Sequence, residues 1–326
     1  MKIVLLEQRS IGMDLDYSRL YRLGSVTANP GCGEEEMKNL IKDADIIVGN
    51  KFFFGERTLD EAPDLKLICI TSTGYDNCDL DYLKKRGVAL CNVAAYSTDS
   101  VAQHTFALLF RYMEKISEFE AHVHTRDFIG RDLHSLVPYH FFELRDKTWG
   151  IIGLGNIGKR VAEIASAFGC RVIYYSASGE NRDNRYERVS IEELLRQSDV
   201  LSIHAPLNEK TSNLLTAREF QMMKPTACLI NVGRGGIANE ADLAEAVRSG
   251  VIGGACIDVY EKEPIREDSP YLSLGDYSNL ILTPHIAWAA KESRQRSVDE
   301  TAANIESFFS GGGGKRGGKN GKPPKQ

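Results

Sequence analysis

The stretch TWGIIGLGNIGKRVAEIASAFG, at residues 148–169, decides the fold of this chain. It begins as a short apolar strand and continues through three spaced glycines, Gly153, Gly155 and Gly158, into helix-forming residues. A turn of this kind lets the backbone approach a pyrophosphate and directs a helix N-terminus at it. The stretch therefore predicts a dinucleotide site in the middle of the chain, with folded segments before and after it.

The residues around the glycines carry this interpretation, because a bare GxGxxG pattern also occurs in unrelated turns. Apolar residues recur with helical spacing after the turn, and a second strand is expected at Arg171–Tyr175. The helical positions are Ile157, Val161, Ile164 and Ala165. A glycine-rich turn in some other βαβ unit is the alternative interpretation.

The composition is that of an ordinary globular protein and narrows the classes of function. The 326 residues suggest two domains, with 42% hydrophobic and 26% charged residues. A net charge of −5 argues against a general nucleic-acid binder. No apolar run approaches the ~18–20 residues of a membrane span, and the first apolar run is too short for a signal peptide.

The cysteines indicate a reducing compartment. They are scattered, none forms a CxxC pair, and several lie in apolar strand-like segments. Their positions are 32, 69, 78, 91, 170, 228 and 256. We therefore expect reduced thiols in a cytoplasmic protein without a metal centre.

Strand-like and helix-like segments alternate along the chain, which predicts two α/β units with parallel, doubly wound sheets. Candidate strands of the first unit are Lys2–Glu7, Asp45–Asn50, Leu65–Thr71 and Val88–Val93, with helices at Glu34–Lys42 and Asp79–Arg86. Candidate strands of the second unit are Thr148–Gly153, Arg171–Ser176, Val200–His204, Ala227–Val232, Gly254–Val259 and Asn279–Leu282.

The remaining segments suggest how the domains are connected. A long apolar helical pattern, Thr98–His124, is expected to cross between domains or to pack against a second subunit, and the irregular stretch Arg126–Arg145 to embrace a partner chain. An amphipathic helix, Lys291–Phe309, is expected to return to the first unit. The expected domains are thus residues 1–97 with 290–310, and residues 98–289, followed by a flexible Gly/Lys-rich tail at 311–326.

Ligands of open α/β sheets bind at the carboxyl ends of strands, so those ends give the candidate site. Ser176 stands where an acid usually accepts hydrogen bonds from the ribose hydroxyls of NAD, which leaves both NAD and NADP open. His204 follows the next strand, and a lone histidine there is expected in the wall of a site rather than in its chemistry.

Three later strand ends carry groups suited to acid–base and anion chemistry. Arg234 lies between glycines, where its planar guanidinium can bind a carboxylate with two hydrogen bonds. Either Glu261 or Glu263 can face the same edge of the sheet. His285 directly follows a proline at the end of the last strand. Each residue alone is unremarkable, but together they form a candidate catalytic set beside a nicotinamide site.

These motifs together resemble the D-isomer-specific 2-hydroxyacid dehydrogenases, from about Met1 to Phe309. The matching stretches are GLGNIG at 153–158, HAPLNEKT at 204–211, NVGRG at 231–235, DVYEKEP at 258–264 and TPHIAWA at 283–289. Trp288 and the stretch YSTDSVAQHTFAL at 96–108 are most similar to the glycerate dehydrogenase (hydroxypyruvate reductase) branch. Ser176 in place of an acid, and Gln103 in place of a common glutamate, depart from the family pattern.

The resemblance implies two Rossmann-like domains with the cofactor in the cleft between them, and a set of site residues. It places the catalytic roles on Arg234, Glu263 and His285, Glu263 being preferred to Glu261 because it precedes Pro264. It places cofactor contacts on Gly153, Gly155, Asn156, Ile157, Gly158, Ser176, His204, Ala205, Pro206, Thr211, Asn231, Val232, Gly233, Asp258 (for the carboxamide) and Ala287. It places substrate contacts on Asn50, Lys51, Ser72, Thr73, Gly74 and Trp288.

The implied activity is reduction of a small 2-oxo acid by a nicotinamide cofactor, in a homodimer. His285 is expected to donate a proton, assisted by Glu263, while Arg234 holds the substrate carboxylate. Two alternatives stay open: a phosphorylated hydroxyacid as substrate, as in phosphoglycerate dehydrogenases, and a nucleotide-sensing binding module like the corepressors that share this fold. An assay of 2-oxo acids with NADH and NADPH discriminates among them.

Overall fold

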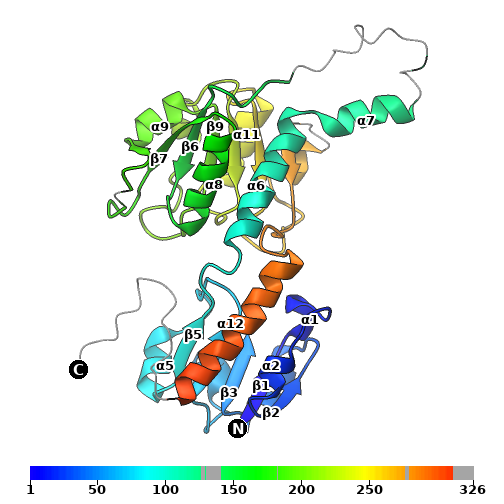
Figure 1. Ribbon diagram of the computed structural model, residues 1–326, viewed down its shortest axis with the longest axis vertical. Helices are drawn as coiled ribbons and strands as arrows, with labels where there is room; N and C mark the ends of the chain where they lie inside the picture. The colour runs from blue at the N-terminus through cyan, green and yellow to red at the C-terminus, as the bar shows by residue number, and fades with distance from the viewer. Residues whose placement is uncertain (126–128, 130–140, 182, 276–278, 311–326) are drawn as a thin grey trace. The chain divides into compact units, whose positions relative to one another are not determined.

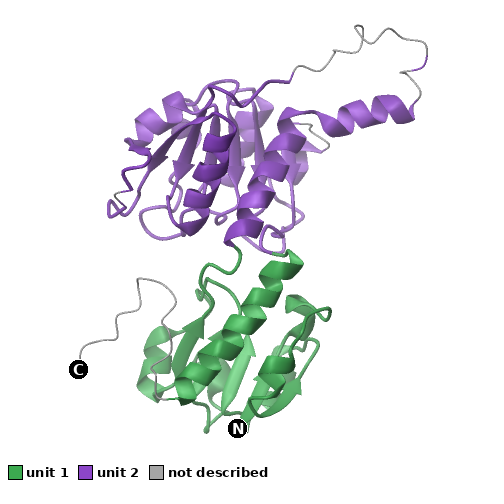
Figure 2. Cartoon of the chain, viewed as in Figure 1, with its two compact units in different colours: residues 1–97, 289–326 green, residues 98–288 purple. Residues whose placement is uncertain are grey.

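The computed structural model describes residues 1–125, 129, 141–181, 183–275 and 279–310. The chain divides into two compact units (Figure 2). Unit 1 comprises residues 1–97 and the chain from residue 289 onward, and unit 2 comprises residues 98–288. The predicted fold class is confirmed, because each unit is built on a parallel β-sheet with helices on both faces (Figure 1).

Unit 1 has a five-stranded sheet in the order β2-β1-β3-β4-β5. Its strands are β1 (Lys2–Leu5), β2 (Ser25–Ala28), β3 (Ile46–Gly49), β4 (Leu67–Ile70) and β5 (Ala89–Asn92). Its helices are α1 (Gln8–Ile11), α2 (Ser18–Tyr21), α3 (Glu34–Ile41), α4 (Glu56–Leu59), α5 (Leu80–Arg86) and α12 (Lys291–Phe309). Strands β3 and β4 are buried along their whole length, as continuous apolar runs in parallel sheets are.

Helix α12 closes one face of the unit 1 sheet although it comes from the far end of the chain. Its Val298 and Ile305 lie in the same apolar core as β1, β3 and β4. Its polar side chains reach strand ends, with Ser297 Oγ donating to the carbonyl of Thr71 at 2.7 Å. Arg19 of α2 forms an ion pair with Glu306 at 2.7 Å, which pins two helices of the same face together.

Unit 2 has a seven-stranded sheet in the order β12-β11-β10-β9-β6-β7-β8. Its strands are β6 (Thr148–Ile152), β7 (Arg171–Tyr175), β8 (Glu187–Arg188), β9 (Val200–Ile203), β10 (Cys228–Asn231), β11 (Gly254–Ile257) and β12 (Leu280–Leu282). Its helices are α6 (Thr98–Met113), α7 (Ile116–His124), α8 (Asn156–Ala167), α9 (Ile191–Gln197), α10 (Ala217–Phe220), α11 (Glu240–Arg248) and a 3₁₀ helix at Leu272–Leu274.

Side chains along the strands of unit 2 point alternately to the two faces of the sheet, and each face has its own apolar core. Ile151 faces the core shared with α6 and α8, whereas its neighbour Ile152 faces the core shared with α9, α10 and α11. The chain order reverses beside β6, because β7 pairs with one edge of β6 and β9 with the other. Such a switch point opens a crevice at the carboxyl ends of the strands, where ligands bind.

The prediction of one continuous helix over Thr98–His124 is wrong, because the structure has two separate helices there. Lys115 adopts a left-handed backbone with φ of 51° and separates α6 from α7. The Lys115 side chain turns back over the Tyr112 ring and bonds Asn279, which holds this break in place. The apolar residues of α6 are buried in unit 2's own core, whereas α7 buries none of its residues and extends from the body of the unit (Figure 1).

The remaining differences from the sequence-based expectation are short elements. Strand β2 and helices α1, α2 and α4 are each four residues long, too short to show a period. The stretch Arg126–Arg145 and the tail at 311–326 lie largely or wholly outside the described residues. All seven cysteines are free thiols. No described helix has the length and apolar character needed to cross a membrane.

Candidate active site

The glycine turn after β6 has the shape that a dinucleotide requires. Gly153 has φ of 92°, and a Cβ there would lie 2.8 Å from the backbone nitrogen of Ala205. A Cβ on Gly158 would collide with the carbonyl of Gly153, so α8 packs against the turn only with glycine. Gly155 caps α8 and has nothing within 4 Å of a Cβ position, which leaves the space above the helix N-terminus open. These features fit a bound diphosphate.

The end of β7 offers hydroxyl groups rather than a carboxylate. Ser176 is buried, with its Oγ 3.5 Å from Ser178 Oγ. Asn181 bonds the carbonyl of Leu154 and ties the following loop to the glycine turn. Asp183, further along this loop, is held by Arg185 at 2.9 Å and Lys159 at 3.1 Å. The hydrogen bonds from Arg185 hold the pKa of Asp183 far below its ordinary value.

His204, at the end of β9, is unsuited to proton transfer. Burial lowers the pKa of His204 to about 3, so the ring is neutral. Its Nε2 lies 3.0 Å from Ser202 Oγ, which also accepts a hydrogen bond from Trp149 Nε1 at 2.8 Å. Its Nδ1 is buried with no hydrogen-bond partner among the described residues. A bound ligand would satisfy that atom, which fits a residue in the wall of a cofactor site.

The hydroxyl of Thr211 is used within its own loop. It donates to the carbonyl of Pro206 at 2.7 Å and accepts from the backbone of Asn208 at 2.8 Å. Thr211 itself is buried. These two bonds fix the shape of the Ala205–Pro206 segment.

Arg234 is positioned by the backbone around it. Asn231, at the end of β10, donates to the carbonyl of Arg234 at 2.9 Å and accepts from the nitrogen of Gly233 at 3.1 Å. A Cβ on Gly235 would collide with the carbonyl group of Tyr260. Because only glycine permits this approach, the loop that carries Arg234 lies against the loop that carries Glu263.

Glu263 and His285 form a direct pair. His285 Nδ1 lies 2.6 Å from Glu263 Oε2, and the other oxygen of Glu263 accepts from the backbone nitrogen of Tyr260 at 3.0 Å. Burial acts to raise the pKa of Glu263, but the bonds to His285 and Tyr260 and the charge of Arg234 outweigh it and lower that pKa. Glu261 is exposed, and its backbone nitrogen bonds Glu240 instead.

The loop that carries His285 is held by Asp258. His285 has φ of 54°, a strained conformation for a residue with a side chain. The fully buried carboxylate of Asp258 accepts from the backbone nitrogens of Ile286 and Ala287, both at 2.9 Å, and from the hydroxyl of Thr283 at 2.6 Å. Trp288 Nε1 donates to the carbonyl of His285 at 2.8 Å.

The expected substrate residues of the first domain lie at one edge of the unit 1 sheet. Asn50 and Lys51 follow β3, whereas Ser72, Thr73 and Gly74 follow β4. Ser72 Oγ donates to Asn50 Oδ1 at 2.7 Å, and Thr73 Oγ1 donates to the carbonyl of Val93 at 3.0 Å. The two segments are therefore joined within unit 1.

Several residues that support the loops of the site were not predicted from the sequence. Glu7 is buried after β1 and accepts from the backbone nitrogens of Asn50 at 2.8 Å and Lys51 at 3.0 Å. Burial raises the pKa of Glu7 in spite of those bonds. An acid directly after an apolar strand, in the sequence LLEQ, is a signal that could have found it. His104 and Tyr260, which contact Thr283, carry no comparable signal.

The fold and these strand ends define a nicotinamide-dependent oxidoreductase, and comparison with known proteins gives its family. The family pattern described as D-isomer specific 2-hydroxyacid dehydrogenase, NAD binding domain, matches residues 106–287. The chain belongs to the D-isomer-specific 2-hydroxyacid dehydrogenase family. It is an NAD-dependent enzyme, as the sequence resemblance predicted.

Similar proteins span nearly the whole chain. A hydroxypyruvate reductase of Blautia hydrogenotrophica is 34% identical over 319 residues, covering 95% of this chain and 98% of that protein. A glycerate dehydrogenase of Methylorubrum extorquens is 34% identical over 313 residues, covering 95% and 96%. The solved structure of an acyclic imino acid reductase in complex with NADPH and D-Arg has a TM-score of 0.85 and 31% identity, covering 97% and 99%.

The contact between Gly235 and Tyr260 predicts a steric effect. We expect Gly235→Ala to lower the free energy of unfolding by about 1–3 kcal/mol and to reduce turnover, because the added methyl group pushes the Arg234 loop away from Tyr260. Gly33→Ala is the control, since a Cβ at Gly33 meets nothing within 4 Å. Chemical denaturation and steady-state turnover of both variants are the measurements. Equal stability of the two variants would contradict the steric argument.

Proposed function

We propose that this enzyme reduces a small, unphosphorylated 2-oxo acid of the hydroxypyruvate and glyoxylate type to the 2-hydroxy acid. The observation that carries the proposal is the pair of His285 Nδ1 and Glu263 Oε2 at 2.6 Å, with Arg234 on the adjoining loop. The relatives named hydroxypyruvate reductase and glycerate dehydrogenase support the same substrate class.

The proton donor in this proposal is His285. The Glu263 carboxylate only accepts hydrogen bonds, so Nδ1 of His285 carries a proton and Nε2 is left for the substrate. The nicotinamide cofactor, when bound, supplies the hydride. Before proton transfer, Glu263 stabilises the positively charged imidazolium of His285. As negative charge develops on the keto oxygen of the substrate, that oxygen takes the proton from Nε2 of His285.

The remaining groups hold the substrate. The guanidinium of Arg234 matches the substrate carboxylate and polarises the keto group. We assign the first domain, residues 1–97 and 290–310, to substrate binding through Asn50, Lys51 and the backbone of Ser72–Gly74. We assign residues 98–289 to the cofactor, and Trp288 to the substrate side of the site.

The cofactor is NAD, and we propose that NADP is also accepted. A carboxylate at the end of β7 would repel a 2′-phosphate, but Ser176 carries no charge and its hydroxyl can bond either form. Asp183 is paired with both Arg185 and Lys159, so this group of three side chains keeps one net positive charge and does not repel a 2′-phosphate. The relative solved with NADPH supports this reading.

A panel of substrates tests the activity. Absorbance at the reduced nicotinamide band should fall when the enzyme meets hydroxypyruvate or glyoxylate with NADH, and more slowly with 3-phosphohydroxypyruvate. His285→Ala should lower kcat by about 10²–10⁴-fold and leave NADH binding nearly unchanged. Binding of NADH without turnover of any 2-oxo acid would favour the sensor alternative, and a preference for the phosphorylated substrate would favour the phosphoglycerate type.

The pair of Glu263 and His285 also predicts a pH effect. Burial raises the pKa of Glu263, but its bonds to His285 and Tyr260 outweigh burial and lower that pKa, so the carboxylate keeps its charge at pH values where an ordinary glutamate begins to lose it. Protonation of Glu263 should therefore lower the rate of reduction only at acid pH, and in Glu263→Gln, which has no group to titrate, we expect a lower kcat without this acid fall. A pH–rate profile of both proteins is the measurement. An unchanged profile would show that the carboxylate does not act on the proton donor.

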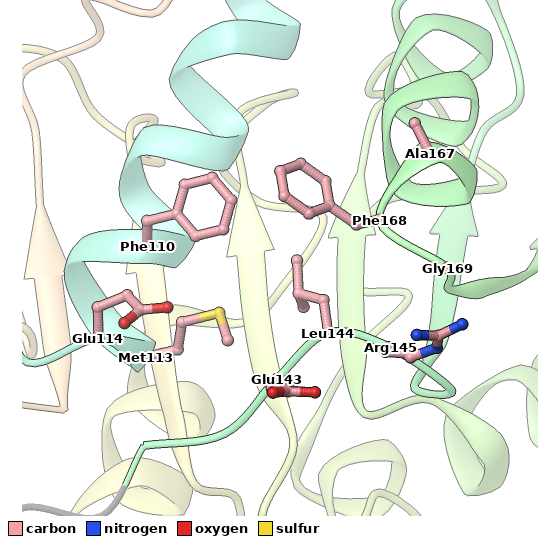
Figure 3. A pocket seen from close by; sticks show the side chains of 9 residues that line it. All are labelled: Phe110, Met113, Glu114, Glu143, Leu144, Arg145, Ala167, Phe168 and Gly169. Carbon is pink, nitrogen blue, oxygen red and sulfur yellow. The ribbon is translucent and has the colours of Figure 1, made fainter.

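We further propose a cytoplasmic homodimer formed by unit 2. Helix α7 buries no residue of its own, and exposes Ile116 and Val123. A helix of nine residues is marginal alone in water. Beside α6 and α8 lies a pocket of about 530 Å³ whose lining includes the apolar side chains of Phe110, Met113, Leu144 and Phe168, with Glu114, Glu143 and Arg145 beside them (Figure 3). In a symmetric dimer, α7 of one copy would cover apolar surface of this kind on the other.

The dimer is tested by charge at the exposed apolar surface. Val123→Glu, and separately Phe168→Glu, should shift the mass in sedimentation equilibrium from dimer toward monomer. Leu272→Glu is the matched control, because Leu272 and Phe168 are each 46% exposed and Leu272 lies on neither feature. Retention of the wild-type mass by both test variants, or a monomeric wild-type protein, would exclude this interface.

A further inference from the structure

Two side chains of α6 reach the loop that carries His285. Ser100 Oγ donates to the carbonyl of Ala287 at 2.6 Å. His104, one helical turn later, places Nε2 at 3.2 Å from Thr283 Oγ1 and 3.6 Å from Asp258 Oδ1. Residues four apart share one face of a helix, so the same face of α6 contacts both ends of the loop.

We infer that His104 is a positioning residue, which fixes the loop carrying His285 through Thr283 and Asp258. The inference rests on the proposed function of His285 as proton donor. His104 acts from helix α6 and at a distance from the chemistry. Among the described residues, the hydrogen bonds and ion pairs of its side chain are with Thr283 and Asp258, and none is with Glu263 or Arg234.

The direction of each hydrogen bond follows from the carboxylate. Asp258 only accepts, so the Thr283 hydroxyl donates to it at 2.6 Å. With its proton committed, Thr283 Oγ1 accepts from His104, and the His104 tautomer must carry its proton on Nε2. Burial lowers the pKa of His104 although the charge of Asp258 opposes this, so the ring donates as a neutral imidazole. Hydrogen bonds in such a series strengthen one another.

The loop needs this support because its backbone is strained. His285 keeps φ of 54° while Asp258 accepts from both following backbone nitrogens. A left-handed residue with a side chain persists only where its surroundings hold it. If Thr283 rotated away, Asp258 would lose one of its partners and could turn from Ile286 and Ala287. A shift of about 1 Å at a catalytic group can cost ~10²-fold in rate.

The closing experiment compares His104→Phe with His104→Gln in the full-length enzyme. Phenylalanine fills the space without a donor, whereas the glutamine amide can replace the Nε2–H group. We expect His104→Phe to lower kcat for hydroxypyruvate by about 10-fold with KM for NADH unchanged, and His104→Gln to recover most of that loss. Thr283→Val should resemble His104→Phe, and the double variant should lose little more, because both break the same link.

A second measurement does not depend on turnover. The backbone amides of Ile286 and Ala287 should exchange with deuterium about 10-fold faster in His104→Phe, and at nearly the wild-type rate in His104→Gln. Thr105→Val is the matched control on the next residue of α6, because it removes a buried hydrogen bond to Val101 that does not lead to the loop.

The outcomes separate the inference from the proposed function. Unchanged exchange at both amides in His104→Phe overturns the positioning role, whether or not the enzyme turns over. Equal changes in His104→Phe and Thr105→Val also overturn it, because they reveal a general loss of helix stability. A wild-type enzyme that reduces no 2-oxo acid refutes the proposed function, while faster amide exchange in His104→Phe would still support the hold on the loop.

Discussion

The arrangement of unit 2 depends on the adjacency of the carboxyl ends of β10, β11 and β12 in one parallel sheet. Because these strands run side by side, the loops after them share one edge. The glycine at position 235 then allows the first loop to touch the second, and a carboxylate on the second loop bonds the imidazole on the third. The grouping of Arg234, Glu263 and His285 thus follows from the order of the strands and from the absence of a side chain at Gly235.

Two carboxylates of the second loop divide the task of holding His285. Glu263 contacts the imidazole itself, and so acts on its charge. Asp258 accepts hydrogen bonds from backbone and hydroxyl groups of the loop and lies 3.6 Å from the His104 ring, so it acts on the position of His285. The sequence resemblance assigned Asp258 to the carboxamide of the cofactor. Three acceptor directions of the carboxylate are already used in the described contacts, so about one of the ~4 that a carboxylate has is left for a ligand.

The sequence predicted the parallel sheets and most strand positions well, because long apolar runs followed by glycine or polar residues mark buried parallel strands. The strand-end residues followed from the same rule. The break at Lys115 did not, because the flanking segments are both apolar and helical in period. The roles of Glu7 and His104 depend on partners more than 40 and more than 150 residues away, respectively, a separation no local pattern reports.

The late position of helix α12 in the sequence affects how unit 1 folds while the protein is being synthesised. Val298 and Ile305 complete an apolar core whose other members come mostly from the first 70 residues. On the ribosome, those residues emerge long before the helix that covers them, and the whole of unit 2 is translated in between. Unit 2 can close its two cores with its own residues, whereas the N-terminal sheet must wait with an apolar face partly bare. Nascent chains stalled before residue 291 should therefore be the species that chaperones retain.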